Sequence, residues 1–129
     1  MATGAVVLVV DDEPLIRALT VDALEEDGFD VLEASTGDYA LTVLRKREDI
    51  SAVVTDVEMP GEIDGFALAN IARAMRPELA IVIISGRVEP GFGRIAPDAR
   101  FLSKPFRPVR LVSMVRELIA GTGQDLAFP

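Results

Sequence analysis

Four places in this 129-residue sequence carry a side chain that can do chemistry directly after a short apolar stretch. The first holds two adjacent acids, Asp11 and Asp12, and the second holds a single acid, Asp56. The other two hold a hydroxyl group, Ser85, and an amine, Lys104. Any one of these residues alone could be a helix cap, a solvated turn residue or an ordinary surface residue. Together they form a set of three carboxylates, one hydroxyl group and one ammonium group, which indicates a site for chemistry.

The three acids predict a site for a hard cation. Asp11 and Asp12 at one position and Asp56 at a neighbouring one would repel each other in a partly desolvated cleft unless a cation joined them. A site built only from oxygen, with few protein ligands and room for water and phosphate, suits Mg²⁺ better than Ca²⁺. We therefore expect Mg²⁺ as the cofactor.

Lys104 and Asp56 indicate chemistry on a phosphoryl group. The chain has 11 Arg and 2 Lys, so a lysine at this position suggests a site that uses a compact point charge. A carboxylate beside a metal ion and a lysine can accept a phosphoryl group, because the cations neutralise the phosphoryl oxygens while the carboxylate attacks phosphorus. Asp56 is the expected nucleophile, because it stands alone while Asp11 and Asp12 form a pair suited to metal.

The composition excludes several other classes of protein. The chain contains no cysteine and no histidine, which excludes disulfides, thiolate zinc sites, cysteine nucleophiles and every mechanism that needs an imidazole base. The net charge of −8 argues against direct binding of nucleic acid. Because the longest apolar run, residues 5–10, is too short to cross a bilayer and no secretory signal opens the chain, we expect a cytoplasmic protein without membrane contact.

Strands and helices that alternate along the chain would position these residues. Apolar runs predict the strands, and apolar residues at helical spacing predict the helices. The expected strands are 5–10, 30–34, 51–55, 79–84 and 99–102, and the expected helices are 14–28, 36–47, 64–75 and 107–120. In the first helix the apolar stripe is Leu15, Ile16, Leu19, Ala23 and Leu24. Prolines and glycines interrupt residues 87–97, so any helix there should be short, irregular or absent.

This alternation predicts an α/β fold with a doubly wound, five-stranded parallel sheet and helices on both faces. In such sheets the ligand lies beyond the carboxyl ends of the strands. Asp11, Asp12, Asp56, Ser85 and Lys104 all follow strands, so we expect them to meet at one edge of the sheet.

With these elements in place, the sequence resembles the receiver domain of two-component response regulators, of the chemotaxis-regulator kind, over about residues 5–120. Four segments carry the resemblance: 9–14 (VVDDEP), 54–60 (VTDVEMP), 84–86 (ISG) and 101–106 (FLSKPF). Each segment alone is weak, but four in this order at strand ends are specific. The resemblance implies the flavodoxin-like strand order 2-1-3-4-5.

The resemblance also implies roles for individual residues. It makes Asp56 the phosphoacceptor, Asp11 and Asp12 the acidic metal pair together with Asp56, and Glu58 a metal ligand through its backbone carbonyl. The remaining roles fall to three residues: Lys104 as the partner of the phosphoryl group, Ser85 as the hydroxyl that moves toward it, and Phe101 as the aromatic switch. A cis peptide bond before Pro105 is common in the family.

Function and partners follow from the same resemblance. The domain, residues 1–120, would take a phosphoryl group from a histidine kinase or a phosphotransfer protein. It would assist its own Mg²⁺-dependent phosphorylation and dephosphorylation without being an enzyme. Phosphorylation would change its protein-binding surface. The output would be a downstream protein target or self-association through the strand at 99–102 and the helix at 107–120. Residues 121–129 are expected to be a tail. The chain is either a single-domain regulator or part of a longer one.

Two other functions compete with this interpretation. A small Mg²⁺-dependent phosphatase with an aspartyl nucleophile, of the haloacid dehalogenase kind, would carry Asp-x-Asp after its first strand, whereas this chain carries Asp11-Asp12-Glu13. A receiver-like binding module that is not phosphorylated would not need the full set of Asp12, Asp56 and Lys104. One departure from the family is the loop at 61–64, which is one residue longer than the common form.

Overall fold

The computed structural model describes residues 4–86 and 98–121. Within these ranges strands and helices alternate, and their bounds lie within two residues of the expected ones; α1 ends two residues before the expected stop at Gly28. The strands are β1 (Val6–Val10), β2 (Asp30–Ala34), β3 (Ile50–Asp56), β4 (Ala80–Ser85) and β5 (Arg100–Ser103). The helices are α1 (Pro14–Glu26), α2 (Gly37–Lys46), α3 (Gly65–Met75) and α4 (Pro108–Gly121). The expected irregular stretch at 87–97 and residues 122–129 of the expected tail lie outside the described residues.

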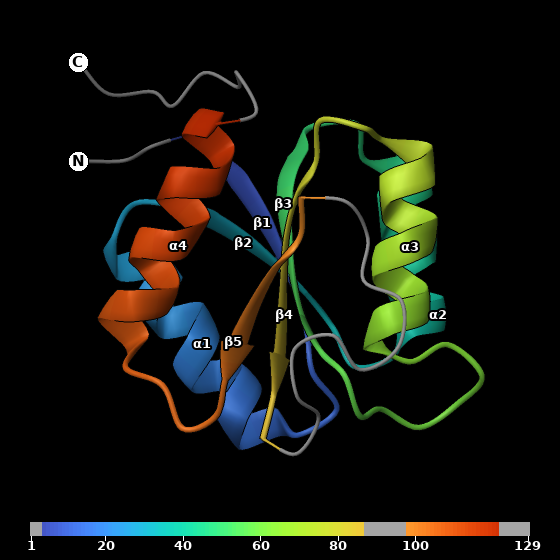
Figure 1. Ribbon diagram of the computed structural model, residues 1–129, viewed down its shortest axis with the longest axis horizontal. Coiled ribbons are helices and arrows are strands. Elements are labelled where there is room, and N and C mark those ends of the chain that lie inside the picture. The colour runs from blue at the N-terminus through green and yellow to red at the C-terminus, as the bar shows by residue number, and fades with distance from the viewer. Residues whose placement is uncertain (1–3, 87–97, 122–129) are drawn as a thin grey trace.

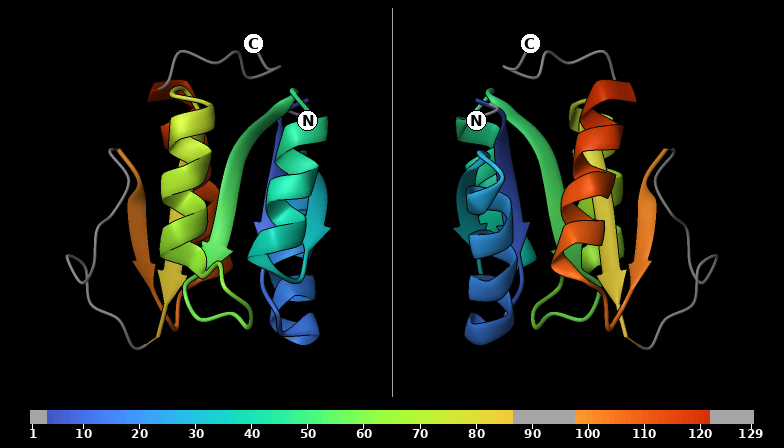
Figure 2. Two further views of the ribbon diagram at one scale, coloured as in Figure 1. Left: turned by 90° about the vertical axis from the view of Figure 1, so that its right-hand side faces the viewer. Right: turned by 90° about the vertical axis from the view of Figure 1, so that its left-hand side faces the viewer.

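The strands form one parallel sheet in the order β2-β1-β3-β4-β5, which confirms the predicted topology. α1 and α4 cover one face of the sheet, and α2 and α3 cover the other (Figure 1). The two side views show the same pairing of helices (Figure 2). The predicted doubly wound arrangement with helices on both faces is therefore confirmed.

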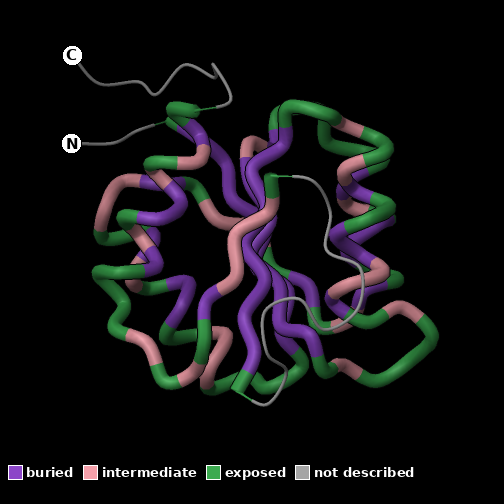
Figure 3. Tube along the Cα trace, in the orientation of Figure 1, coloured by how far each residue is buried: buried purple, intermediate pink, exposed green. Residues whose placement is uncertain are grey.

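Burial follows from this three-layer arrangement. The central strands β1 and β4 are buried along their whole length, whereas the edge strands β2 and β5 are only partly buried (Figure 3). Strands covered on both faces need apolar residues at every position, not at alternate ones. This explains why the runs VVLVV and AIVIIS were readable as strands from the sequence.

The expected apolar stripe of α1 is wrong in part. Leu24 is buried as expected, but the helix turns Thr20 and Val21 toward the sheet, while Leu15 is 73% exposed and Leu19 57% exposed. The hydroxyl of Thr20 donates a hydrogen bond to the backbone carbonyl of Ile16 (3.1 Å), so burying this polar group leaves no donor unpaired. Leu15 and Leu19 therefore lie on the solvent-exposed side of α1.

In the part of the chain that the structure describes, no helix is both long and apolar enough to cross a membrane.

Candidate functional site

The carboxyl ends of four strands bring the predicted residues to one edge of the sheet. Asp56 ends β3 and Ser85 ends β4, while Asp11 with Asp12 and Lys104 directly follow β1 and β5. The strand register aligns these ends, because Val10 of β1 pairs with Thr55, and Asp56 pairs with Ile84. The convergence expected from the sequence is therefore present, and α/β sheets place their ligands at this edge.

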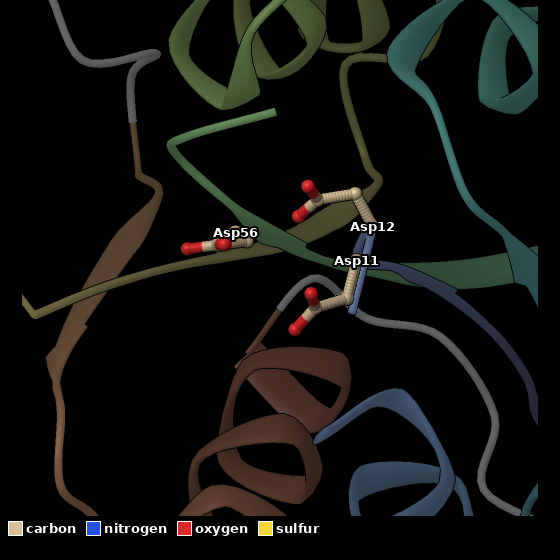
Figure 4. Close-up of side chains that lie close together, drawn as sticks. All are labelled: Asp11, Asp12 and Asp56. Atoms are coloured by element: carbon tan, nitrogen blue, oxygen red, sulfur yellow. The ribbon is translucent and has the colours of Figure 1, made fainter. Parts of the chain in front are cut away.

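The three aspartates lie close enough to share an ion. Asp11, Asp12 and Asp56 can each offer a carboxylate oxygen such that all three oxygens lie within 4.8 Å of one another. Figure 4 shows the three side chains next to each other, with Asp11 and Asp12 extending from the end of β1 and Asp56 from β3. Asp11 and Asp56 are buried and Asp12 is exposed. A set of hard oxygen donors open to solvent on one side fits a hydrated divalent cation such as Mg²⁺.

The electrostatics of this cluster favour a cation. Burial raises the pKa of Asp56 above its ordinary value; the Lys104 ammonium opposes this, and the Asp11 carboxylate adds to it. Burial also raises the pKa of Asp11, and the neighbouring charges of Asp12 and Glu13 act in the same direction. The Lys104 ammonium lies 3.5 Å from Oδ1 of Asp56. One lysine faces three carboxylates, so a bound cation would relieve the remaining repulsion.

The backbone holds Asp56 in place. Oδ1 of Asp56 accepts a hydrogen bond from the N–H of Val57 (2.9 Å), and its carbonyl accepts one from the Thr55 hydroxyl (2.9 Å). Gly65, the first residue of α3, packs so closely that a Cβ atom there would lie 2.1 Å from the carbonyl oxygen of Asp56. The Gly65 N–H also donates to the Val57 carbonyl (2.9 Å). This requirement for glycine could not be predicted from the sequence, because it arises from the close approach of α3 to β3.

The loop between β3 and α3, which is one residue longer than the common form, rests on the start of α2. A Cβ atom on Gly37 would lie 2.5 Å from the carbonyl oxygen of Ile63, so the loop and α2 are in direct backbone contact. Gly61 has a φ of +99°, a conformation that glycine adopts without strain. The loop ends at Asp64, whose side chain caps α3 by accepting from the Ala67 N–H (2.9 Å).

The remaining predicted residues line the same edge. Ser85 is buried, and its carbonyl accepts a hydrogen bond from the Lys104 N–H (2.9 Å), which links the ends of β4 and β5. The Lys104–Pro105 peptide bond is cis, as expected. Phe101 is partly buried against the core that α2 and α3 cover. Glu58 is exposed and lies two residues beyond Asp56.

An apolar groove beside this edge was not predicted from the sequence. It has a volume of about 460 Å³ and is lined by residues of α1, of the segment that leads into α4 and of the start of α4, among them Leu19, Phe106 and Leu111. Lys104 borders it as well, so the groove adjoins the acidic cluster. A signal was present in the sequence: the apolar residues of α1 form a stripe wider than the part of the helix that faces the sheet.

Comparison with known proteins points to one family. Residues 7–116 match the family model described as the response regulator receiver domain. The chain is 37% identical over 123 residues to the sensor kinase CckA of Brucella abortus and 34% identical over 116 residues to its response regulator receiver protein CpdR. These alignments cover 92% and 88% of this chain, and 13% and 95% of the respective relatives.

A solved structure agrees with these matches. The response regulator receiver protein of Sinorhizobium medicae superposes with a TM-score of 0.85 at 31% identity, covering 92% of this chain and 97% of that one. Several relatives are much longer than the matched region: the chain spans 51% of the transcriptional regulatory protein AruR of Pseudomonas aeruginosa.

Proposed function

This chain belongs to the family of response regulator receiver domains, the phosphoacceptor signalling modules of two-component systems, and on that basis we propose that Asp56 is its phosphoacceptor. The observation that carries the proposal is the convergence of Asp11, Asp12 and Asp56 with Lys104 at one buried sheet edge. The proposed donor is a histidine kinase or a phosphotransfer protein.

The reaction requires a carboxylate that can attack phosphorus. An oxygen of Asp56 forms a bond to the phosphorus of a phosphohistidine as the phosphorus–nitrogen bond breaks, and the imidazole leaves with the bonding electron pair and takes up a proton. Lys104, whose ammonium lies 3.5 Å from Asp56 Oδ1, is placed to interact with the phosphoryl oxygens. The Val57 N–H, which donates to Asp56 Oδ1, orients the nucleophile.

The acidic residues supply the ligands for Mg²⁺. We assign Asp11, Asp12 and Asp56 to this site, because the three carboxylates meet and are hard oxygen donors. The resemblance to the family adds the backbone carbonyl of Glu58. When bound, Mg²⁺ would supply positive charge to the phosphoryl oxygens. The domain itself provides the nucleophile, the lysine and the metal ligands, and so assists its own phosphorylation and dephosphorylation.

Ser85 and Phe101 are the proposed route by which the signal leaves the site. A phosphoryl group on Asp56 gives Ser85 a new hydrogen-bond acceptor, and Ser85 moves toward it. Phe101, which is already partly buried, then rotates further inward. Hydrogen exchange of residues 85–86 and 98–103 with and without beryllofluoride and Mg²⁺ tests this route: unchanged protection despite bound ligand would contradict it.

The apolar groove between α1 and the start of α4 is the proposed docking site of the phosphodonor protein. A protein that delivers a phosphoryl group to Asp56 has to cover the sheet edge beside Lys104, and Leu19, which lines the groove there, is exposed. Leu19→Asp should slow phosphorylation by the kinase and leave phosphorylation by acetyl phosphate unchanged. Met75→Asp, on the exposed side of α3, is the control. Equal rates from the kinase for both variants would rule this surface out.

The two competing functions have different support. The family match and the relatives all support a receiver domain, and the acidic pair lacks the Asp-x-Asp spacing of the alternative phosphatase. A binding module without phosphorylation would have no use for Lys104 paired with Asp56. The expected domain limits at residues 1–120, the cytoplasmic location and output through β5 and α4 remain predictions.

Dependence on metal and on lysine tests the proposed chemistry. We expect acetyl phosphate to add one phosphoryl group to the protein with Mg²⁺ and none with a chelator, as measured by intact mass. Lys104→Ala should reduce the rate by about two orders of magnitude, the range for losing one electrostatic contact to a transition state. Arg107→Ala, an exposed cation near the start of α4, is the matched control. Full phosphorylation in the presence of the chelator would contradict the proposal.

A further inference from the structure

Arg17, in the second turn of α1, makes two directed contacts just behind the acidic cluster. Its Nη1 atom donates a hydrogen bond to the backbone carbonyl of Asp11 (2.7 Å), and its Nε atom donates to Oε1 of Glu33 in β2 (2.9 Å). The side chain of Arg17 is 19% exposed and that of Glu33 50% exposed. One guanidinium therefore joins α1, the end of β1 and the end of β2.

We propose that Arg17 is a positioning residue that holds the Asp11–Asp12 turn in the geometry that binds the metal ion. This proposal rests on the proposed function, because the metal site belongs to it. Arg17 itself does not touch the metal ion or the phosphoryl group.

The way Asp11 is anchored supports this role. Its N–H donates to the Ala34 carbonyl (3.1 Å), its carboxylate accepts from the Glu13 N–H (2.9 Å), and its carbonyl accepts from Arg17. Of these three contacts, the one from Arg17 is made by a side chain of another element. Without the hydrogen bond from Arg17, the carbonyl group of Asp11 would no longer be held. Asp12 is the next residue along the chain, so its position would be less fixed as well.

Charge gives the second argument. Asp11, Asp12 and Glu13 are three consecutive acids, and their mutual repulsion opposes a tight turn. Arg17 places a positive charge beside them but donates to a carbonyl, so the carboxylates of Asp11 and Asp12 remain available to a cation. Glu33 holds the Nε side of the guanidinium and thereby directs Nη1 toward the Asp11 carbonyl.

Arginine suits this position better than lysine. The two contacts use two nitrogen atoms of one planar group, and an ammonium offers a single nitrogen on a flexible stem. Groups that orient metal ligands without touching the metal typically contribute 10- to 100-fold to metal affinity.

The matched control is Arg116 in α4. It also donates to one carboxylate and one carbonyl, but both belong to Asp27, at the far end of α1: Nε donates to the Asp27 carboxylate and Nη2 to the Asp27 carbonyl (3.1 Å). Arg17→Gln and Arg116→Gln thus remove comparable anchors of α1, of which only one adjoins the acidic cluster.

The first measurement is Mg²⁺ binding to the full chain by calorimetry. We expect Arg17→Gln to weaken affinity by roughly 10- to 100-fold, Arg17→Lys to restore only part of it, and Arg116→Gln to leave it unchanged. Glu33→Gln should produce a smaller loss than Arg17→Gln. In phosphorylation by acetyl phosphate, Arg17→Gln should raise the Mg²⁺ concentration for half-maximal rate, while the rate at saturating Mg²⁺ approaches that of wild type.

The second measurement needs no metal. Amide hydrogen exchange at residues 11–13 should be faster in Arg17→Gln than in wild type, and unchanged in Arg116→Gln. If Arg17→Gln does not fold, Arg17→Lys and Glu33→Gln provide the same comparisons. Equal Mg²⁺ affinity and equal exchange in folded Arg17 variants and wild type would overturn the positioning role. Absence of Mg²⁺ binding by wild type would instead overturn the proposed function, and the exchange measurement would still decide the role of Arg17 in the turn.

Discussion

At the carboxyl end of the sheet, the carboxylates of Asp11, Asp12 and Asp56 lie together and Lys104 pairs with Asp56, whereas at the amino end Arg73 of α3 and Arg76, its C-terminal cap, donate to backbone carbonyl groups. Arg76 donates to the carbonyls of Leu44 and Arg47, at the end of α2, and Arg73 donates to the carbonyl of Pro77 (2.8 Å). At the amino end the charges satisfy main-chain acceptors. At the carboxyl end the carboxylates repel each other and their pKa values are raised.

The difference between the two ends separates the charged residues that stabilise the fold from those that act in function. Charged groups that are paired within the fold stabilise it, and charged groups that repel each other in the folded protein indicate a site where a ligand binds. Substitutions at the two ends should therefore have opposite consequences, and the following predictions test this from the largest effect to the smallest.

The largest effect is expected within the acidic pair. Asp12 is exposed, while Asp11 is buried and already accepts a hydrogen bond from the Glu13 N–H. Asp12→Ala should therefore weaken Mg²⁺ binding by roughly 100-fold or more, beyond the 10- to 100-fold typical of a group that only orients the ligands, and Asp11→Ala should weaken it less. Calorimetric titration of both variants ranks them, and the reverse order would overturn this division of roles.

Arg76→Ala should act on stability alone. The substitution removes the partly buried hydrogen bond to the Leu44 carbonyl and the exposed one to the Arg47 carbonyl, and a hydrogen bond within a protein contributes about 0.5–1.5 kcal/mol net. We expect a loss of this size in urea unfolding, with phosphorylation by acetyl phosphate unchanged at a temperature where the variant is folded. A variant that is as stable as wild type but is phosphorylated slowly by acetyl phosphate would contradict the proposed separation between the two ends of the sheet.

Asp56→Asn should stabilise the metal-free protein at neutral pH. The pKa of Asp56 is raised on folding, so the folded protein holds a proton that the unfolded chain releases, and stability falls as the pH rises through the raised pKa. Asparagine does not ionise, so Asp56→Asn should avoid this loss. The expected gain in the free energy of unfolding is about 1 kcal/mol, the scale of one unfavourable buried polar group. Urea unfolding in a chelator at several pH values should show the gain at neutral pH and its disappearance in acid. A variant less stable than wild type at neutral pH would contradict this.

The smallest effect is expected at a solvent-exposed ion pair that also lies at the amino end of the sheet. Arg47 lowers the pKa of Asp49 through a two-pronged contact of 2.8 and 2.9 Å. Stability from this pair is present above the ordinary pKa of an aspartate and is lost as the pH falls through the lowered one. Both side chains are exposed to solvent, which screens the charges. Asp49→Asn should therefore barely shift the urea midpoint, and a shift as large as that of Arg76→Ala would contradict the ranking.

The elements that could be predicted from the sequence are those whose signal is local. β1 is apolar at every position, and β4 is apolar at every position before Ser85. The polar residues that end or follow the strands meet because parallel strands end at the same edge. The convergence of Asp11, Asp12, Asp56, Ser85 and Lys104 could therefore be predicted from the sequence, and their individual roles stay predictions.

What could not be predicted depends on contacts between elements. Helical periodicity shows that α1 has an apolar face, but the rotation that buries Thr20 and exposes Leu19 is set by packing against the sheet and α4. The link from Arg17 to Asp11 and Glu33 joins three elements, and the close approach of Gly65 to Asp56 joins two. The sequence contains these residues, but their partners become known only when the strands are placed side by side.

The central claim, that Asp56 is the residue phosphorylated, is tested most directly by intact-mass measurement of wild type and Asp56→Asn after treatment with acetyl phosphate and Mg²⁺. The account predicts one added phosphoryl group on wild type and none on Asp56→Asn, with Asp49→Asn behaving as wild type. Equal phosphorylation of wild type and Asp56→Asn would contradict it.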